Sequence, residues 1–375
     1  MARILHTGIG ARFMPKQSSH NSHSAIYENQ NFGGAVKRNQ KPKTRRTIFF
    51  SSPPLIKAGG SVVGEKESEG PIGGYFDKVV DAKGGKKKES FEFLEKEMLE
   101  DAIEIAIKKA RLSPKQIDML LCGDLLNQMT SSSYAARELG IAYMGLYSAC
   151  STMSQALAVG AAFLNAGYFK TVACATVSHF ATAERQFRYP LEYGAQRPPY
   201  AQWTVTGAGC SILTNEKGKG NRITSATFGK VVDYGIDDLN NMGAAMAPAA
   251  LDTLITLFVD TGLRPEDFDL IVTGDLGKLG SDILRDLAEE QGYRLGQNYT
   301  DCGQLIYDYS QKIYQGGSGC GCSASVLNSY LLAKMDGGYY NRIAFLATGA
   351  LMSPQSCFQG GTIPCVSHGV VIERG

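Results

Sequence analysis

The residue best placed for chemistry is Cys150, which stands directly before a run of small residues, 151–165, that predicts a buried helix. A cysteine at a strand-to-helix junction lies in the positive field of the helix N-terminus, which favours the thiolate and lowers the pKa of the thiol. The pattern therefore indicates a nucleophile or a site for an anion. The alternative is a buried cysteine that only packs against its neighbours.

A nucleophilic cysteine needs a base, and only two histidines, His179 and His368, occur after residue 46. Each adjoins a run of β-forming residues, so we expect each at a strand end near a pocket. A histidine in such a place is either a base or a group that only forms hydrogen bonds. The sequence leaves both roles open.

Further polar residues for a pocket follow the first of two similar apolar runs. Asp124, Asn127 and Gln128 come directly after this run, and the carboxyl ends of strands in an α/β sheet face the ligand crevice. Arg185 and Arg188, three residues apart, have the spacing of a carboxylate clamp. Ion pairs at the surface or at an interface explain these two arginines equally well.

An internal repeat supplies the elements that position these residues. Residues 112–125 are similar to residues 263–276 at an offset of 151, and each copy has a proline turn, four apolar residues and then Gly-Asp. Residues 167–173 are similar to residues 338–344, and each of these follows a helix of small residues. Short apolar runs bounded by turns predict strands buried on both faces of a sheet. Asp275 is the second-copy equivalent of Asp124.

The repeat divides the chain into two βα-rich halves, residues 47–222 and 223–375, after a tail of 46 residues. This tail holds nine Lys or Arg residues and one acidic residue, without a run of apolar residues long enough for a signal peptide. We expect the tail, residues 1–46, to be disordered. It either contacts an anionic surface or is simply solvated.

The composition restricts the classes of site and compartment. Nine cysteines without regular spacing, and without a secretion signal, predict free thiols in a reducing compartment. Cys320 and Cys322 have one residue between them and no histidine nearby, so they do not predict a metal site. No stretch reaches the roughly 20 apolar residues of a membrane span. We expect no metal bound by the protein alone, no cofactor and no nucleic-acid partner.

Two resemblances can be stated at this point. Ser148-Ala-Cys-Ser-Thr152 on a duplicated frame resembles the nucleophile region of thiolases and ketoacyl synthases. Four segments resemble the stage V sporulation protein AD family of spore-forming bacteria, and they are residues 123–128, 181–190, 241–250 and 367–371. The first resemblance implies the thiolase-like α/β fold, with its two halves in a layered α/β/α/β/α core.

The second resemblance implies a function in sporulation. The protein would bind dipicolinate (pyridine-2,6-dicarboxylate), free or with Ca²⁺, and serve its uptake into the developing spore and its release in germination. It would lie at the periphery of the inner spore membrane, with integral membrane proteins of the same complex as partners. Thiolase-fold proteins usually pair through a sheet edge, which implies a homodimer.

The catalytic pattern of the resembling enzymes is incomplete here. The resemblance implies a Gly-His-Pro motif of thiolases where residues 315–323 lack histidine, and a histidine of ketoacyl synthases just after the second repeated strand, where this chain has Gly274-Asp275-Leu276. A nucleophile without its base loses most of its rate advantage. We therefore expect a non-catalytic binding protein, and we expect the helix N-terminus at Cys150 to be its main contact with the ligand. The alternatives are a Cys150-dependent acyltransferase or condensing enzyme assisted by His368 and His179, and an assembly subunit with an inert pocket.

Overall fold

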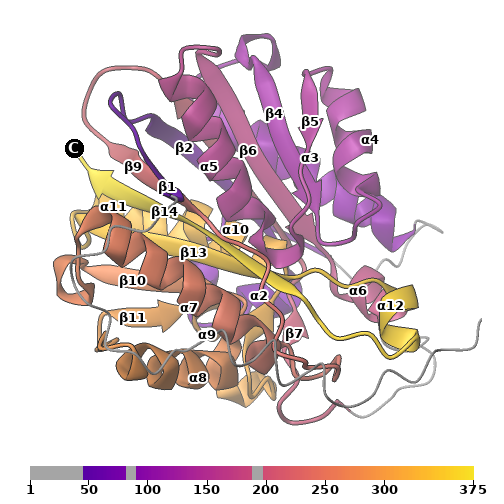
Figure 1. The fold of residues 1–375 in the computed structure, drawn as a ribbon. Coiled ribbons are helices and arrows are strands. Elements are labelled where there is room, and N and C mark those ends of the chain that lie inside the picture. Colours follow the sequence, from indigo (N-terminus) through magenta and orange to yellow (C-terminus); the bar gives the residue numbers. More distant parts are fainter. Residues whose placement is uncertain (1–44, 82–89, 188–196) are drawn as a thin grey trace, which may run out of the picture. The chain divides into compact units, whose positions relative to one another are not determined.

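The computed structural model describes residues 45–81, 90–187 and 197–375. Most of the predicted tail, residues 1–44, therefore lies outside the described residues. The described chain is built on one large mixed sheet, with helices on both outer faces and between its two parts (Figure 1).

The sheet contains two sets of five strands. The first set is β2 (Leu55–Gly64), β4 (Met119–Asp124), β5 (Tyr143–Gly145), β6 (Thr171–Ser178) and β8 (Gly207–Thr214). The second set is β9 (Asn221–Phe228), β10 (Leu270–Gly274), β11 (Tyr299–Asp301), β13 (Arg342–Ala350) and β14 (Cys365–Arg374). Short strands β1 (Thr47–Phe49) and β3 (Lys78–Val80) extend the sheet, and β7 (Trp203–Thr204) pairs with β12 (Gly317–Ser318) separately.

Both sets follow the same strand order. Numbered along the chain within its own set, each runs third, second, fourth, fifth, first, from the outer edge to the junction of β9 with β2. The fifth strand, β8 or β14, is antiparallel to its neighbours, whereas the second, third and fourth strands are parallel. The similar segments of the sequence form β4 and β10, and then β6 and β13. The boundary at residues 222 and 223 stays a prediction.

The helices form three layers. α3 (Phe91–Lys109) and α4 (Thr130–Leu139) cover the outer face of the first set, and α7 (Met242–Thr261) and α8 (Gly277–Glu290) cover that of the second. α5 (Thr152–Asn165) and α10 (Cys320–Val326) lie between the sets. This arrangement matches the predicted α/β/α/β/α layering (Figure 1). The remaining helices are short: α2 (Glu65–Ser68), α6 (Phe180–Phe187), α9 (Cys302–Ile306), α11 (Leu332–Asp336), α12 (Pro354–Phe358), the π-helix η7 (Leu327–Leu331) and single turns that include η3 (Ala149–Ser151).

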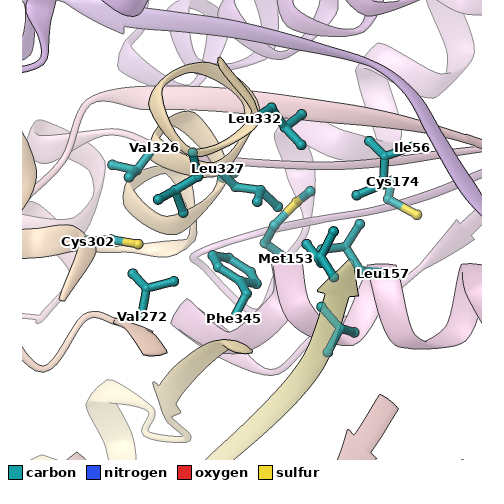
Figure 2. Packing of buried hydrophobic residues seen from close by; sticks show 14 of the residues in the cluster. Ile56, Met153, Leu157, Cys174, Val272, Cys302, Val326, Leu327, Leu332 and Phe345 are labelled. Atoms are coloured by element: carbon teal, nitrogen blue, oxygen red, sulfur yellow. The ribbon is translucent and has the colours of Figure 1, made fainter. Parts of the chain in front are cut away.

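The central layer carries the main core because small residues let its helices approach both sets of strands. Met153 and Leu157 of α5 pack with Phe345 of β13 in the middle of the molecule (Figure 2). Every residue of α10 is buried, and Gly209 of β8 lies so close to this helix that a Cβ atom there would meet the Ala324 carbonyl oxygen at 2.4 Å. The small-residue composition is therefore a packing requirement.

One helix among the described residues, α7, is long and apolar enough to cross a membrane by length and composition alone. Two thirds of its most apolar window is buried, and it packs against β13 and β14. Its apolar character is accounted for by the core of the second strand set. The eight cysteines with described side chains are buried and free, as the sequence predicts.

Candidate functional site

Cys150 lies at a tight junction between the two strand sets. It belongs to η3, the turn that leads directly into α5. Ala149 adopts a left-handed backbone, φ 49°, and the turn is fixed to the second half because Ser151 Oγ donates to the Ala347 carbonyl at 2.7 Å. Gly349 makes this approach possible, since a Cβ atom there would lie 1.9 Å from the Ser148 carbonyl oxygen. The sequence prediction of Cys150 at the head of a buried helix is confirmed.

A pocket opens beside Cys150, with about 570 Å³ of free space including its mouth. Most of its walls are apolar and come from Leu125, α6, the start of α7 and the end of β13. Its polar side chains are those of Tyr147, Glu184, Gln202, Thr204 and Ser318. None of the described lining residues is Lys, Arg or His. The mostly apolar walls with a few polar groups are typical of a small-molecule site.

The thiol of Cys150 is protonated rather than activated. Burial raises the pKa of this thiol well above its ordinary value, and the nearby Asp275 raises it further, while the Gly319 backbone N–H acts in the opposite direction. The predicted lowering of this pKa by the helix field is therefore wrong. The cost of removing a thiolate from water exceeds the effect of the few amides at the start of α5.

Asp275 directly follows β10 and is near enough to Cys150 to raise the pKa of its thiol. It is fully buried in a left-handed backbone, φ 75°, and neither carboxyl oxygen accepts a hydrogen bond of normal geometry from a described residue, although the Gly319 N–H lies near it. Burial and then the neighbouring Asp301 raise the pKa of Asp275 well above its ordinary value, and the Gly319 N–H only partly opposes this. Gln202, a pocket residue, donates its side-chain N–H to the Asp275 carbonyl oxygen.

The second-half segment at residues 315–323 contributes a thiol rather than a base. Cys320 begins α10 and packs in one apolar cluster with Cys150, Leu125 and Ala183. Its Sγ donates to the Val177 carbonyl oxygen at 3.0 Å, and burial raises its pKa well above the ordinary value. A neutral thiol bound in this way does not accept a proton from Cys150.

Neither predicted histidine lines the pocket. His179 follows β6, is buried, and accepts a hydrogen bond at Nδ1 from the Ala181 N–H at 3.1 Å. His368 lies within β14, and its Nδ1 accepts from the Gly229 N–H at 3.3 Å. Burial lowers the pKa of His368 to about 4, so its ring is neutral near pH 7. Each histidine accepts a backbone hydrogen bond, and its choice between the two roles stays a prediction.

The polar residues after β4 do not converge on the pocket. Asp124 is buried, and its carboxylate accepts the backbone N–H groups of Ser131 and Ser132 at 2.7 and 2.8 Å, at the start of α4. Asn127 and Gln128 are exposed. The residue of this segment that does line the pocket is Leu125, so the predicted polar contacts are replaced by an apolar wall.

The predicted arginine clamp is not formed by Arg185, whose half-exposed side chain pairs with Glu92. Arg188 lies outside the described residues. A different arginine, Arg197, donates to the pocket residue Glu184 at 2.8 Å and stacks over Trp203, 4.6 Å from its ring centroid. The sequence around Arg197 contains no pattern that would have predicted its place beside the pocket.

Comparisons with known proteins show the family of the chain. Residues 44–373 match the family described as stage V sporulation protein AD. Stage V sporulation protein AD of Bacillus subtilis (strain 168) is 46% identical over 330 residues, which are 88% of this chain and 97% of that protein. The chain belongs to the stage V sporulation protein AD family. The family resemblance seen in the sequence is thus confirmed.

Solved structures show the fold that this member of the family adopts. The 3-oxoacyl-[acyl-carrier-protein] synthase III from Aquifex aeolicus VF5 aligns with a TM-score of 0.54 and 14% identity, over 86% of this chain and 100% of that one. A single-residue variant of OleA from Xanthomonas campestris aligns with a TM-score of 0.58 and 11% identity, over 87% of this chain and 100% of that one. The predicted thiolase-like α/β fold is confirmed, and at these identities the likeness concerns the fold alone.

Proposed function

We propose that this member of the stage V sporulation protein AD family binds dipicolinate in the Cys150 pocket, without catalysis. It would serve dipicolinate uptake into the spore and release in germination. The family supports a role in sporulation, and the resemblance stated above supplies the ligand. The observation that supports the non-catalytic interpretation is the state of Cys150: burial and then Asp275 raise the pKa of its thiol well above the ordinary value, and none of the described pocket-lining residues is a histidine.

The pocket walls suit a small planar ring, and the hydroxyl groups of the pocket can donate to a carboxylate. Met242, Met246 and Phe187 offer polarisable and aromatic walls to a pyridine ring. The hydroxyls of Thr204 and Ser318 are hydrogen-bond donors of the kind that a carboxylate requires. A few oriented polar groups in an apolar cleft give specificity to a small-molecule site.

Calcium, where it takes part, would enter with the ligand. The described residues contain no group of three or more His, Cys, Asp or Glu side chains that could hold a metal ion. Ca²⁺ needs six to eight oxygen ligands, a number that favours the carboxylates of dipicolinate itself together with water. We propose no metal bound by the chain alone and no cofactor.

The assembly is proposed to be a homodimer, attached at the inner spore membrane to integral membrane proteins of the same complex. β5 is an edge strand of the sheet, and Met144 on it and Tyr134 on the adjacent α4 are both exposed. An unpaired edge with apolar side chains is a surface that a second copy can cover about a two-fold axis. The molecular mass in solution, measured for the wild type and for Met144→Lys, checks the dimer. A dimeric wild type and a monomeric variant are expected, and a monomeric wild type would contradict the proposal.

A Cys150-dependent acyltransferase is the second candidate, favoured by the condensing-enzyme fold and by the position of Cys150 beside a pocket. The two candidates make opposite predictions for covalent chemistry. An enzyme of this class forms a thioester on Cys150, whereas the binding protein leaves this thiol unmodified.

Calorimetric titration with dipicolinate, with and without Ca²⁺, tests the proposal. The proteins are wild type, Cys150→Ala and, as a matched control, Cys174→Ala, which alters a buried thiol that does not line the pocket. We expect saturable binding in all three, with affinity reduced only modestly by Cys150→Ala. Isophthalate, which lacks the ring nitrogen, is the ligand control and is expected to bind more weakly.

Mass spectrometry after incubation with acyl-coenzyme A completes the test. The binding proposal expects no mass added to Cys150. An acyl adduct on Cys150, together with no dipicolinate binding at any concentration tested, would reject the proposal in favour of the enzyme.

A further inference from the structure

Asp275 adjoins two residues that line the pocket, Cys150 and Gln202. Gln202 donates its side-chain N–H to the Asp275 carbonyl oxygen, and the Asp275 carboxyl is near enough to Cys150 to raise the pKa of its thiol. Asp275 itself has no exposed surface. A ligand at the Cys150 end of the pocket therefore lies in the electrostatic field of this carboxyl.

Asp275 and its neighbour Asp301 are unequal in their hydrogen bonds. Asp301 accepts four, from Thr273 Oγ1 and from the backbone N–H groups of residues 276, 277 and 303, at 2.8 to 3.1 Å. Asp275 accepts none of normal geometry with its carboxyl group from the described residues, and only the Gly319 N–H lies near it. Two adjacent buried carboxyl groups do not both ionise easily, and the one with more donors retains the charge. The proton thus belongs on Asp275.

The other titratable groups around Asp275 are thiols. They lie on three elements packed against it, and they are Cys150 on η3, Cys302 on α9, and Cys320 and Cys322 on α10. Burial raises the pKa of each thiol well above its ordinary value, so all are neutral near pH 7. Among the described groups that face Asp275, Asp301 is the one that carries charge.

The pocket has little positive charge for an anion. No described lining residue is cationic, and Arg197, at its edge, already pairs with Glu184. An ionised Asp275 would add a second negative charge close to a bound carboxylate, in surroundings where charges are poorly screened. A protonated Asp275 removes that repulsion.

We propose that Asp275 is a neutral carboxylic acid in the folded protein and that a carboxylate ligand binds at the Cys150 end of the pocket only while Asp275 keeps its proton. This inference rests on the proposed ligand class and adds a specificity-determining residue to it. It also assigns the pocket a preference for anions at low and neutral pH that weakens as Asp275 ionises.

Asp275→Asn is the informative variant, because an amide imitates the neutral acid and does not titrate. At pH 7 we expect Asp275→Asn to bind dipicolinate within about threefold of wild type, because one neutral group replaces another. On raising the pH, wild type is expected to lose affinity by up to about tenfold per pH unit once Asp275 ionises, whereas the variant stays constant. Asp282→Asn, which removes an exposed charge on α8, is the control and should follow wild type.

Infrared spectroscopy reads the proton directly and covers the case in which affinity is constant over the accessible pH range. The difference spectrum of wild type minus Asp275→Asn at pH 7 should contain the C=O band of a protonated carboxyl. Asp275→Gly, which accepts the left-handed backbone, replaces the Asn variant if that protein does not fold.

The outcomes separate this inference from the proposed function. Dipicolinate binding without the carboxylic-acid band, or a change in affinity of about tenfold or more in Asp275→Asn at pH 7, would overturn the inference and leave the ligand assignment intact. The absence of dipicolinate binding in wild type would overturn the ligand assignment and, with it, the link between Asp275 and the ligand.

Discussion

The carboxylate of Asp301 accepts the backbone N–H groups of the two residues that directly follow Asp275, at 3.1 and 3.0 Å. Asp301 therefore caps the start of α8 from a neighbouring strand. Asp275 directly precedes this helix but does not cap it. In the first half, Asp124 caps α4 itself. Equivalent positions of the repeat thus have different surroundings.

Asp301→Asn and Asp275→Asn should differ sharply in stability. Asp301→Asn places an NH₂ group against donors that need an acceptor, and we expect the free energy of unfolding to fall by about 3 kcal/mol. Asp275→Asn removes a carboxyl that accepts no hydrogen bond and introduces a residue that tolerates φ 75°, so a change within about 1 kcal/mol is expected. Urea unfolding measures both, and similar losses in the two variants would contradict the assignment of the charge to Asp301.

The pH dependence of stability should show the effect of the buried acids. Burial raises the pKa of Asp124 to about 6, above the value of roughly 3.9 in an unfolded chain. The folded state therefore binds this proton more tightly, so the stability it contributes is complete below about pH 4 and is lost as the pH rises to about 6 and beyond. Asp124→Asn still caps α4 but does not titrate. Its stability should fall less than that of wild type between about pH 4 and pH 7, and parallel curves would exclude the effect.

Cys150 should alkylate slowly in the native protein. Because burial raises the pKa of its thiol, the thiolate is scarce at pH 7, and iodoacetamide should modify it at least about tenfold more slowly than a free cysteine. Peptide mass spectrometry measures the rate, with the urea-unfolded protein as the control. Modification faster than that of a free cysteine would indicate an activated nucleophile and favour the acyltransferase.

Gly349→Ala should damage the site through the backbone. Its new Cβ atom would lie 1.9 Å from the Ser148 carbonyl oxygen, in the turn that carries Cys150, and no side-chain rotation relieves this contact. We expect a loss of about 3 kcal/mol in stability together with loss of ligand binding. Gly369→Ala, on the adjacent strand, meets the Leu346 side chain at 2.9 Å and should cost about 1 kcal/mol. Circular dichroism melting and calorimetry check both variants, and an equal effect in the two would contradict this account.

The repeated strands and the Cys150 junction were predictable from the sequence because both depend on local patterns. Two apolar runs ending in Gly-Asp mark β4 and β10, and the small residues after Cys150 mark α5 as a buried helix. Strand length, turn residues and residue size are properties of short segments. Such segments survive in the structure with bounds close to those predicted.

The use of each polar side chain was not predictable in this way. Asp124 and Asp275 occupy equivalent positions of the repeat. Asp124 caps the helix that follows it, whereas Asp301, distant in the sequence, caps the helix that follows Asp275. The pKa of Cys150 depends on burial by segments far away in the chain, and this burial reversed the expected direction. The pocket walls likewise come from the start of α7 and the end of β13, which no spacing in the sequence connects.

The inequality between Asp124 and Asp275 has a consequence for redesign of the protein. A substitution at Asp124 removes the cap of α4, so only residues that accept hydrogen bonds fit there without a loss of stability. At Asp275 the cap of α8 comes from Asp301, so the side chain at 275 can be exchanged without removing a cap. The duplicated frame thus offers an engineer one position that is fixed by folding and one, adjoining Cys150 and Gln202, at which a new functional group can be introduced.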